Sequence, residues 1–157
     1  MIPPGTPVDS RSIVRSGDVL VTRANTPDLV GMACLVDQPF DSRLVLCDKT
    51  WRINVGDGLD RGFLVEVLRA FPSRRYIQSV ATGTSGSMKN FSQRSLLGMA
   101  VPVPELAEQV RQSGRIAAVT ERIDAEAAAV AKLKELKAGL MADLLTGCVR
   151  VPVEIPS

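Results

Sequence analysis

Histidine is absent from the 157-residue chain, and its absence removes several kinds of chemistry. Without an imidazole the chain cannot form a Ser-His-Asp triad, a histidine general base or a zinc site built on histidine. Cysteine is scarce, since the three residues Cys34, Cys47 and Cys148 show no CxxC spacing. This number and spacing predict free thiols in a reducing cytoplasm and no metal site.

Long apolar runs and aromatic residues are also in short supply. No apolar run reaches the roughly 18 residues that a membrane-spanning helix needs, so no membrane association is expected. The aromatic share is 4% within a hydrophobic share of 45%, which predicts a core of Val, Leu, Ile and Ala. A net charge of +2 is too small to indicate a nucleic-acid binder by itself, so the distribution of charge matters more than its sum.

The basic residues are concentrated in one stretch. Between Val67 and Pro104 there are five basic residues and no acidic one. This stretch includes residues 82–90, which are rich in glycine and small hydroxyl residues and are typical of a loop. A phosphate-binding P-loop is excluded there, because that motif needs glycine before its lysine and Ser or Thr after it, whereas Met88 and Asn90 flank Lys89.

Lysine and arginine beside hydroxyl groups and backbone N–H groups suit contact with DNA phosphates. For Arg74 and Arg75, an alternative is a solvated surface pair without a ligand. The candidate DNA-binding residues are Arg74, Arg75, Ser85, Ser87, Lys89 and Asn90, together with Arg23 and Arg94.

Short β-branched or apolar runs between turn signals predict a mixed α+β fold. The regular βαβ alternation of a doubly wound sheet is missing. Apolar spacing from Gly62 to Phe71 predicts a helix, and residues 56–58 predict a turn. The expected strands cover residues 19–22, 31–36, 44–47 and 51–55.

A long helix is predicted from Glu105 to Thr146, because helix formers dominate this segment and proline is absent. Glu105 suits the positive end of the helix dipole, and Gly147 suits a C-terminal cap. The pair Ser113–Gly114 is unfavourable inside a helix, so a start or bend at this point is an alternative.

Apolar residues recur in this helix with heptad spacing. A helix of this extent would be about 63 Å long, too long to bury its stripe against a domain of roughly 100 residues. We therefore expect a coiled coil with a second helix, while the alternative is a terminal helix folded back on its own domain. The expected interface residues are Ile116, Val119, Ile123, Val130, Leu133, Leu140 and Leu144.

Four segments, taken in chain order, resemble the DNA specificity subunits of type I restriction-modification systems. In these subunits they correspond to a strand, a loop, the start of a conserved spacer helix and the end of that helix. Cys148 departs from the pattern, which has a basic residue at this place. The segments are GDVLVTR at 17–23, ATGTSG at 81–86 with NFS at 90–92, VPVP at 101–104 with EQ at 108–109, and KELKAGLMADLLTGCVRV at 134–151.

The resemblance implies three parts: a target-recognition domain over residues 1–104, a coiled-coil spacer helix over 105–147 and a tail over 148–157. Because 16 residues precede Gly17, the recognition domain is expected to be truncated at its N-terminus. In this family two recognition domains each read half of a bipartite DNA site, and two antiparallel helices set the distance between them.

The resemblance also implies partners and a division of labour. Methyltransferase subunits dock on the helices, hold S-adenosylmethionine and perform the chemistry. The chain is therefore expected to have no catalytic residues and no cofactor. Its expected partners are double-stranded DNA, a methyltransferase subunit with the restriction subunit attached through it, and a second copy or another specificity half-subunit.

Two other readings remain open from the sequence. In the first, a truncated domain no longer reads DNA and the chain is a protein-interaction module that dimerises or binds the methyltransferase subunit. In the second, the chain is a nuclease that holds Mg²⁺ with Asp18, Asp28 or Asp37, although no motif brings these carboxylates together.

Overall fold

The computed structural model describes residues 9–37, 44–83 and 87–150. Residue contacts divide the chain into two compact units, residues 1–114 and residues 115–157. Unit 1 is a small mixed α/β domain, and unit 2 consists mainly of the long C-terminal helix. The predicted α+β fold with a long C-terminal helix is thus confirmed.

The centre of unit 1 is a three-stranded antiparallel sheet with the order β3-β1-β4. Its strands are β1 (Val19–Thr22), β3 (Ala33–Leu35) and β4 (Thr50–Ile53). Val19 and Val21 of β1 are each 1% exposed, so the alternate residues of this strand form the buried face. A second, two-stranded sheet pairs β2 (Ala24–Asn25) with β5 (Lys89–Asn90).

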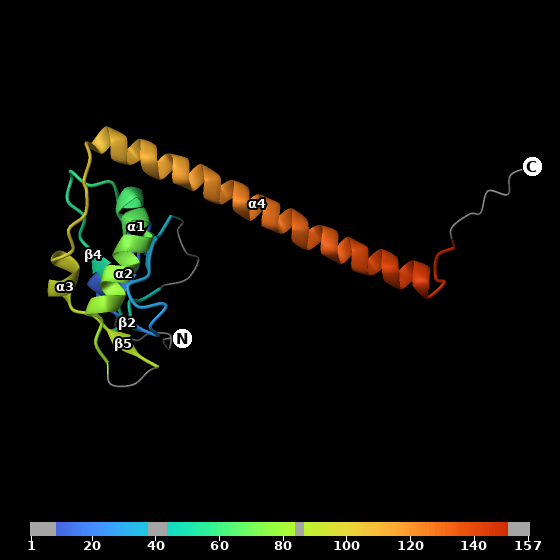
Figure 1. The fold of residues 1–157 in the computed structure, drawn as a ribbon, viewed down its shortest axis with the longest axis horizontal. Helices are drawn as coiled ribbons and strands as arrows, with labels where there is room; N and C mark the ends of the chain where they lie inside the picture. The colour runs from blue at the N-terminus through green and yellow to red at the C-terminus, as the bar shows by residue number, and fades with distance from the viewer. Residues whose placement is uncertain (1–8, 38–43, 84–86, 151–157) are drawn as a thin grey trace, which may run out of the picture. The chain divides into compact units, whose positions relative to one another are not determined.

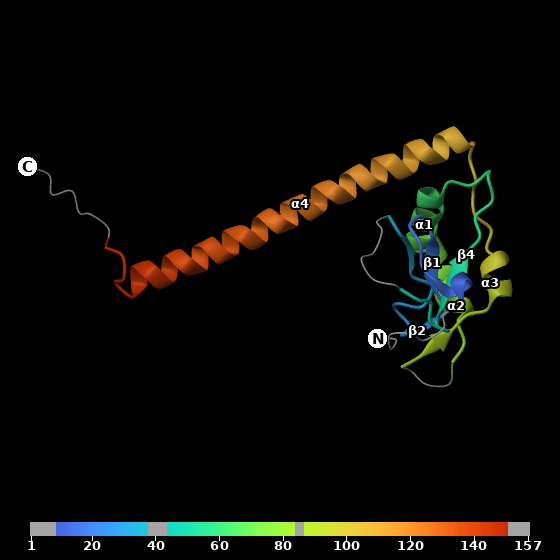
Figure 2. The same cartoon turned by 180° about the vertical axis from the view of Figure 1, so that it is seen from behind.

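Helices α1 (Arg61–Arg69) and α2 (Phe71–Val80) lie against one face of the central sheet, as the opposite views of Figures 1 and 2 show. The side chain of Asp60 caps α1 by accepting a 2.8 Å hydrogen bond from the Phe63 N–H. The core between sheet and helices contains Val21, Val30, Ala33, Leu68, Ile77 and Phe91.

The expected helix over residues 62–71 is divided in the structure, because α1 ends at Arg69 and α2 starts at Phe71. Pro72 explains the break, since proline lacks an N–H and fits the first turn of a new helix better than the interior of an old one. Sequence reasoning also missed helix α3 (Gln93–Leu97), whose cap is the Ser92 hydroxyl accepting from the Ser95 N–H.

The prediction of a strand at residues 44–47 was wrong. Val45 forms only an isolated antiparallel bridge with Ile13. Ile13 directly follows a short 3-10 helix, η1 (Ser10–Ser12), so the partner segment is not extended on that side. The expected strands at 31–36 and 51–55 are shorter, and the strand at 19–22 is confirmed as predicted.

Helix α4 (Leu106–Leu145) is continuous over 40 residues. The prediction of a helix start at Ser113–Gly114 was therefore wrong. The Ser113 hydroxyl donates a hydrogen bond to Asp60 Oδ1 at 2.8 Å. The expected C-terminal glycine is confirmed, because Gly147 has a φ of 74°. Within the described ranges no helix is long and apolar enough to cross a membrane.

Gln109 fixes the first turns of α4 to the rest of unit 1. Its side chain is 1% exposed and accepts a 2.9 Å hydrogen bond from the Asp60 N–H. Its amide nitrogen donates to the carbonyls of Gly58, at 3.1 Å, and Pro104, at 2.8 Å. One buried amide therefore satisfies three backbone groups from two separate segments.

A substitution at Gly31 provides the first test of this fold. Its φ is 75°, and a Cβ there would lie 2.6 Å from Ile77 Cγ2 in the core. Gly31→Ala should therefore lower the free energy of unfolding by about 2 kcal/mol or more, through backbone strain and overpacking. Gly56→Ala is the matched control, because a Cβ there meets no heavy atom within 4 Å. Urea denaturation that ranks the two variants equally would contradict the packing described for Gly31.

Gln109 provides a second test. Gln109→Ala leaves three backbone groups without their partner, which should lower the unfolding free energy by about 2 kcal/mol or more. Gln112→Ala serves as the control, because the Gln112 side chain donates to the neighbouring Glu108 carboxylate of the same helix at 3.0 Å. This control should change stability by no more than about 0.5 kcal/mol. Equal effects of the two changes in thermal or urea unfolding would show that Gln109 does not tie the segments together.

Candidate nucleic-acid interface

Arg23 joins the two sheets of unit 1 through its backbone. The residue lies between β1 and β2; its N–H donates to the Lys49 carbonyl at 2.8 Å, and its carbonyl accepts from the Phe91 N–H at 3.1 Å. These two hydrogen bonds bring the turn before β4 and the end of β5 to the same edge as β2. Three segments that are distant in the sequence therefore meet at Arg23.

The side chain of Arg23 is exposed and lies over an aromatic pair. Its guanidinium carbon is 5.5 Å from the centre of the Trp51 ring, a cation–π distance. Trp51 in turn makes an edge contact with the buried Phe91, with ring centres 5.4 Å apart. The guanidinium of Arg23 therefore lies against an aromatic pair that continues into the core.

The β2–β5 pair carries polar side chains next to Arg23. Asn25 is opposite Lys89, and Ala24 is opposite Asn90. Ala24 is 7% exposed, whereas Asn25 and Lys89 are half-buried. Lys89 Nζ donates to the Gly83 carbonyl at 3.2 Å. The structure thus places Arg23, Lys89 and Asn90 on adjoining segments, and Ser87 lines a pocket together with Asn25 of β2.

A pocket of about 280 Å³ opens between β2, the Cys47–Thr50 turn and the segment before β5. The pKa of the Cys47 thiol is lowered, first by the Thr50 hydroxyl 3.5 Å away and then by the backbone N–H of Lys49. The described part of the lining contains no carboxylate, although Asp48 lies in the turn next to it. The lining residues are Thr22, Ala24, Asn25, Thr26, Cys47, Lys49, Thr50, Ser87 and Met88.

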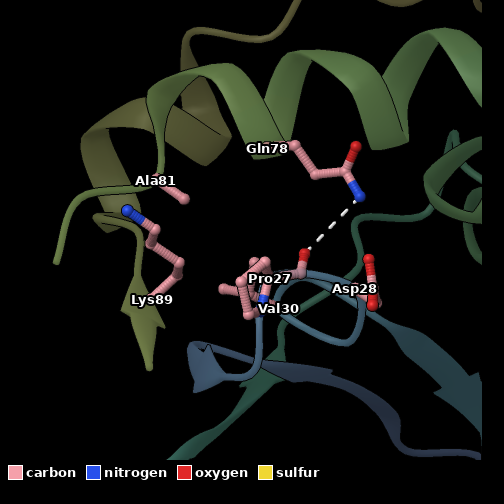
Figure 3. Close-up of a pocket in the computed structure, with 6 residues that line it drawn as sticks. All are labelled: Pro27, Asp28, Val30, Gln78, Ala81 and Lys89. Atoms are coloured by element: carbon pink, nitrogen blue, oxygen red, sulfur yellow. Dashed lines mark hydrogen bonds between the residues drawn. The ribbon is translucent and has the colours of Figure 1, made fainter. Parts of the chain in front are cut away.

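A second pocket, of about 300 Å³, lies between the segment that follows β2, the C-terminal end of α2 and Lys89 of β5. Figure 3 shows Lys89 and Ala81 on one side of it and Gln78, Pro27 and Asp28 on the other. Gln78 donates to the Pro27 carbonyl at 3.5 Å across its rim. This pocket contains both an ammonium and a carboxylate, so its charge is more balanced than that of the first.

The two neighbouring arginines of α2 differ in their surroundings. Arg74 is half-buried and donates to the carbonyls of Val30, at 2.5 Å, and Asp28, at 2.7 Å. Burial lowers the pKa of its guanidinium, and the charge of Asp28 opposes this shift. The side chain of Arg75 is exposed and forms no hydrogen bond or ion pair with the described part of the chain.

Two predicted residues remain, Arg94 and Ser85. Arg94 is exposed on the short helix α3. Ser85 lies outside the described residues. Sequence reasoning missed Asn25, Thr26 and Lys49, which line the first pocket. Their signal in the sequence was weak: a polar stretch follows the first strand, and a lysine lies in an acidic turn with no motif around it.

The carboxylates proposed for a nuclease are dispersed. Asp18 forms an ion pair with Arg52 at 2.8 Å and accepts from the Arg15 N–H. Across residues 9–37, 44–83 and 87–150, no group of three or more His, Cys, Asp and Glu residues is placed to hold a metal ion. Asp28 and Asp37 therefore belong to no such group.

Unit 2 presents the apolar stripe of α4 as an exposed surface. The predicted interface residues are 42% (Ile116) to 63% (Leu133) exposed. Near the C-terminal end the side chains of Leu133, Leu136, Leu140, Met141 and Leu144 line a shallow apolar groove beside Lys137. The seven stripe residues are Ile116, Val119, Ile123, Val130, Leu133, Leu140 and Leu144.

Comparison with known proteins adds one similarity. The type I restriction enzyme EcoEI specificity subunit of Escherichia coli is 30% identical to the chain over 99 residues. The match covers 62% of this chain and 16% of that subunit, so the chain spans a small part of the protein it resembles. No protein-family profile matches the chain.

Proposed function

We propose that the chain is a DNA-recognition half-subunit of a type I restriction-modification enzyme. The observation that carries the proposal is the 30% identity to a type I specificity subunit over 99 residues. In this account unit 1 binds one half of a bipartite DNA site, and α4 is the spacer that pairs with a second helix. The chain performs no chemistry; a methyltransferase subunit docked on it holds S-adenosylmethionine, and the restriction subunit joins through that partner.

The polar edge of unit 1 supports the DNA-binding part of this proposal. The β2–β5 pair places the Asn25 amide opposite the Lys89 ammonium, and both groups are hydrogen-bond donors that suit DNA. The exposed charges of Arg23, Arg75 and Arg94 suit the phosphates on either side of a groove. We propose Ser87 and Asn90 as further contacts, while Arg74 acts mainly by holding the loop at Val30 in place.

The stripe of α4 supports the pairing part. Covering a large apolar side chain is worth about 1.5–3 kcal/mol, so seven exposed stripe residues favour association with a similar helix. An antiparallel pair would place one recognition unit at each end. Lys137, at a core position of the heptad, would then restrict the register of the pair.

A second candidate function is a protein-interaction module that pairs through α4 without reading DNA. The exposed stripe favours this candidate as well, because it needs a partner whether or not unit 1 binds DNA. The two candidates differ in one measurable property, the affinity of the folded chain for duplex DNA.

A double change on the proposed DNA face tests the recognition function. Arg75→Ala with Lys89→Ala removes two charges from this face and leaves the Arg74 hydrogen bonds intact. Binding to all duplexes should weaken, and the slope of log K against log salt should fall by at most about 0.9 for each lost phosphate contact. Fluorescence anisotropy at several salt concentrations measures both quantities.

The control for this experiment is Lys132→Ala with Lys134→Ala, which removes two exposed charges from α4. The control should bind DNA with the wild-type slope. If both double variants behave as wild type, the DNA face lies elsewhere on unit 1; if the folded wild type binds no duplex, the interaction-module candidate replaces the proposal.

Paired charges on α4 test the pairing function. Val130→Asp with Leu133→Asp places two carboxylates in the middle of the stripe, where burial without a partner is costly. Sedimentation at micromolar concentration should show a dimer for the wild type and a monomer for this variant. The matched control is Ala128→Asp with Ala131→Asp, which adds the same charges at the same spacing outside the stripe. A dimer that both variants disrupt equally would argue against the stripe as the interface.

A further inference from the structure

We propose that the pocket between β2, the Cys47–Thr50 turn and Ser87–Met88 is a seat for one phosphodiester group of the DNA backbone. This inference rests on the proposed function, because it names the ligand of a particular place on the DNA-binding face. It concerns Asn25, Thr26 and Lys49, none of which the motifs of the sequence indicate.

Three side-chain donors of the pocket are available to a ligand. Asn25 Oδ1 accepts from the Thr26 N–H at 2.8 Å, which orients the amide and leaves its NH₂ group to donate. The Asn25 NH₂ group, the Thr26 hydroxyl and the Lys49 ammonium have no hydrogen-bond partner among residues 9–37, 44–83 and 87–150. A phosphate oxygen accepts from all three kinds of donor.

Other polar groups of the lining are already engaged. The Thr22 hydroxyl donates to the Leu29 carbonyl at 2.6 Å, and the Thr50 hydroxyl shares a hydrogen bond with the Cys47 sulfur. The available donors therefore come from β2 and the residue after it and from the turn before β4. The backbone hydrogen bond from Arg23 to Lys49 holds these two segments together.

The charge of the pocket selects among phosphate ligands. Among the described residues that line the pocket, Lys49 is the cation and none is a carboxylate. One ammonium balances the single negative charge of a phosphodiester, whereas a phosphate monoester carries about 1.5 to 2 negative charges at neutral pH. A volume of about 280 Å³ also leaves room for water molecules that bridge the phosphate to the walls. The single positive charge of the pocket thus favours a backbone phosphodiester over a free phosphate or a nucleotide.

A phosphate contact fixes the position of a protein on the duplex without reading bases. The seat is next to the β2–β5 pair, so a phosphate held there would set the distance between the DNA backbone and the side chain of Lys89. The predicted effect of losing this contact is therefore the same for every DNA sequence.

Lys49→Ala tests the assignment through the salt dependence of DNA binding. The slope of log K against log salt should fall by about 0.9, the value for one phosphate contact, with equal weakening for unrelated duplexes. Lys49→Arg should keep the wild-type slope, and Lys132→Ala should keep both slope and affinity. A wild-type slope in Lys49→Ala would reject the seat and leave DNA recognition by the rest of the face standing.

Alkylation of the cysteines locates the contact independently. Cys47 lines the pocket, while Cys34 on β3 is exposed outside it, so each molecule carries its own reference. Saturating duplex DNA should slow the reaction of Cys47 with N-ethylmaleimide severalfold and leave Cys34 unchanged, as read by mass spectrometry of the peptides. Inorganic phosphate at matched ionic strength should protect neither cysteine.

The other possible results of the alkylation and binding experiments separate the phosphate seat from the proposed function. Equal protection of Cys47 by inorganic phosphate would replace the backbone seat with a site for free phosphate. Bound DNA that leaves Cys47 unprotected would reject the seat but not the proposed function. A folded chain that binds no duplex would reject both.

Discussion

The two backbone hydrogen bonds of Arg23 are the constraint on which the candidate DNA face depends. They attach the turn at Lys49 and the strand that ends before Phe91 to one point of the chain. Beneath this point the contact between Trp51 and Phe91 fills the space between the two sheets. Backbone hydrogen bonds and core packing therefore hold together the segments that carry the polar side chains.

In the proposed function, DNA recognition and pairing belong to different units of the chain. The polar edge belongs to unit 1, whereas the apolar stripe belongs to unit 2. The first turns of α4 are fixed to unit 1 by the buried amide of Gln109, and the same helix continues into unit 2. In the proposed function this continuity links DNA recognition to a partner, because one helix takes part in both units.

Sequence reasoning predicted features that depend on local pattern. β1, the length of α4 and the cap at Gly147 follow from β-branching, heptad spacing and glycine chemistry. It failed where tertiary contacts decide. The pairing at Val45 stayed a single bridge, and Arg74 is bound to two loop carbonyls that no sequence pattern reveals. Lys49 was missed because its neighbours in space come from a strand that ends more than twenty residues earlier.

The central claim is that a folded pair of these chains recognises DNA by sequence. Selection from a pool of randomised duplexes, with excess nonspecific DNA as competitor, tests it most directly. Two copies related by a twofold axis carry identical reading faces, so the account predicts enrichment of an inverted repeat whose halves are separated by a fixed spacer. Recovery of a random pool by a folded, dimeric chain would contradict the claim.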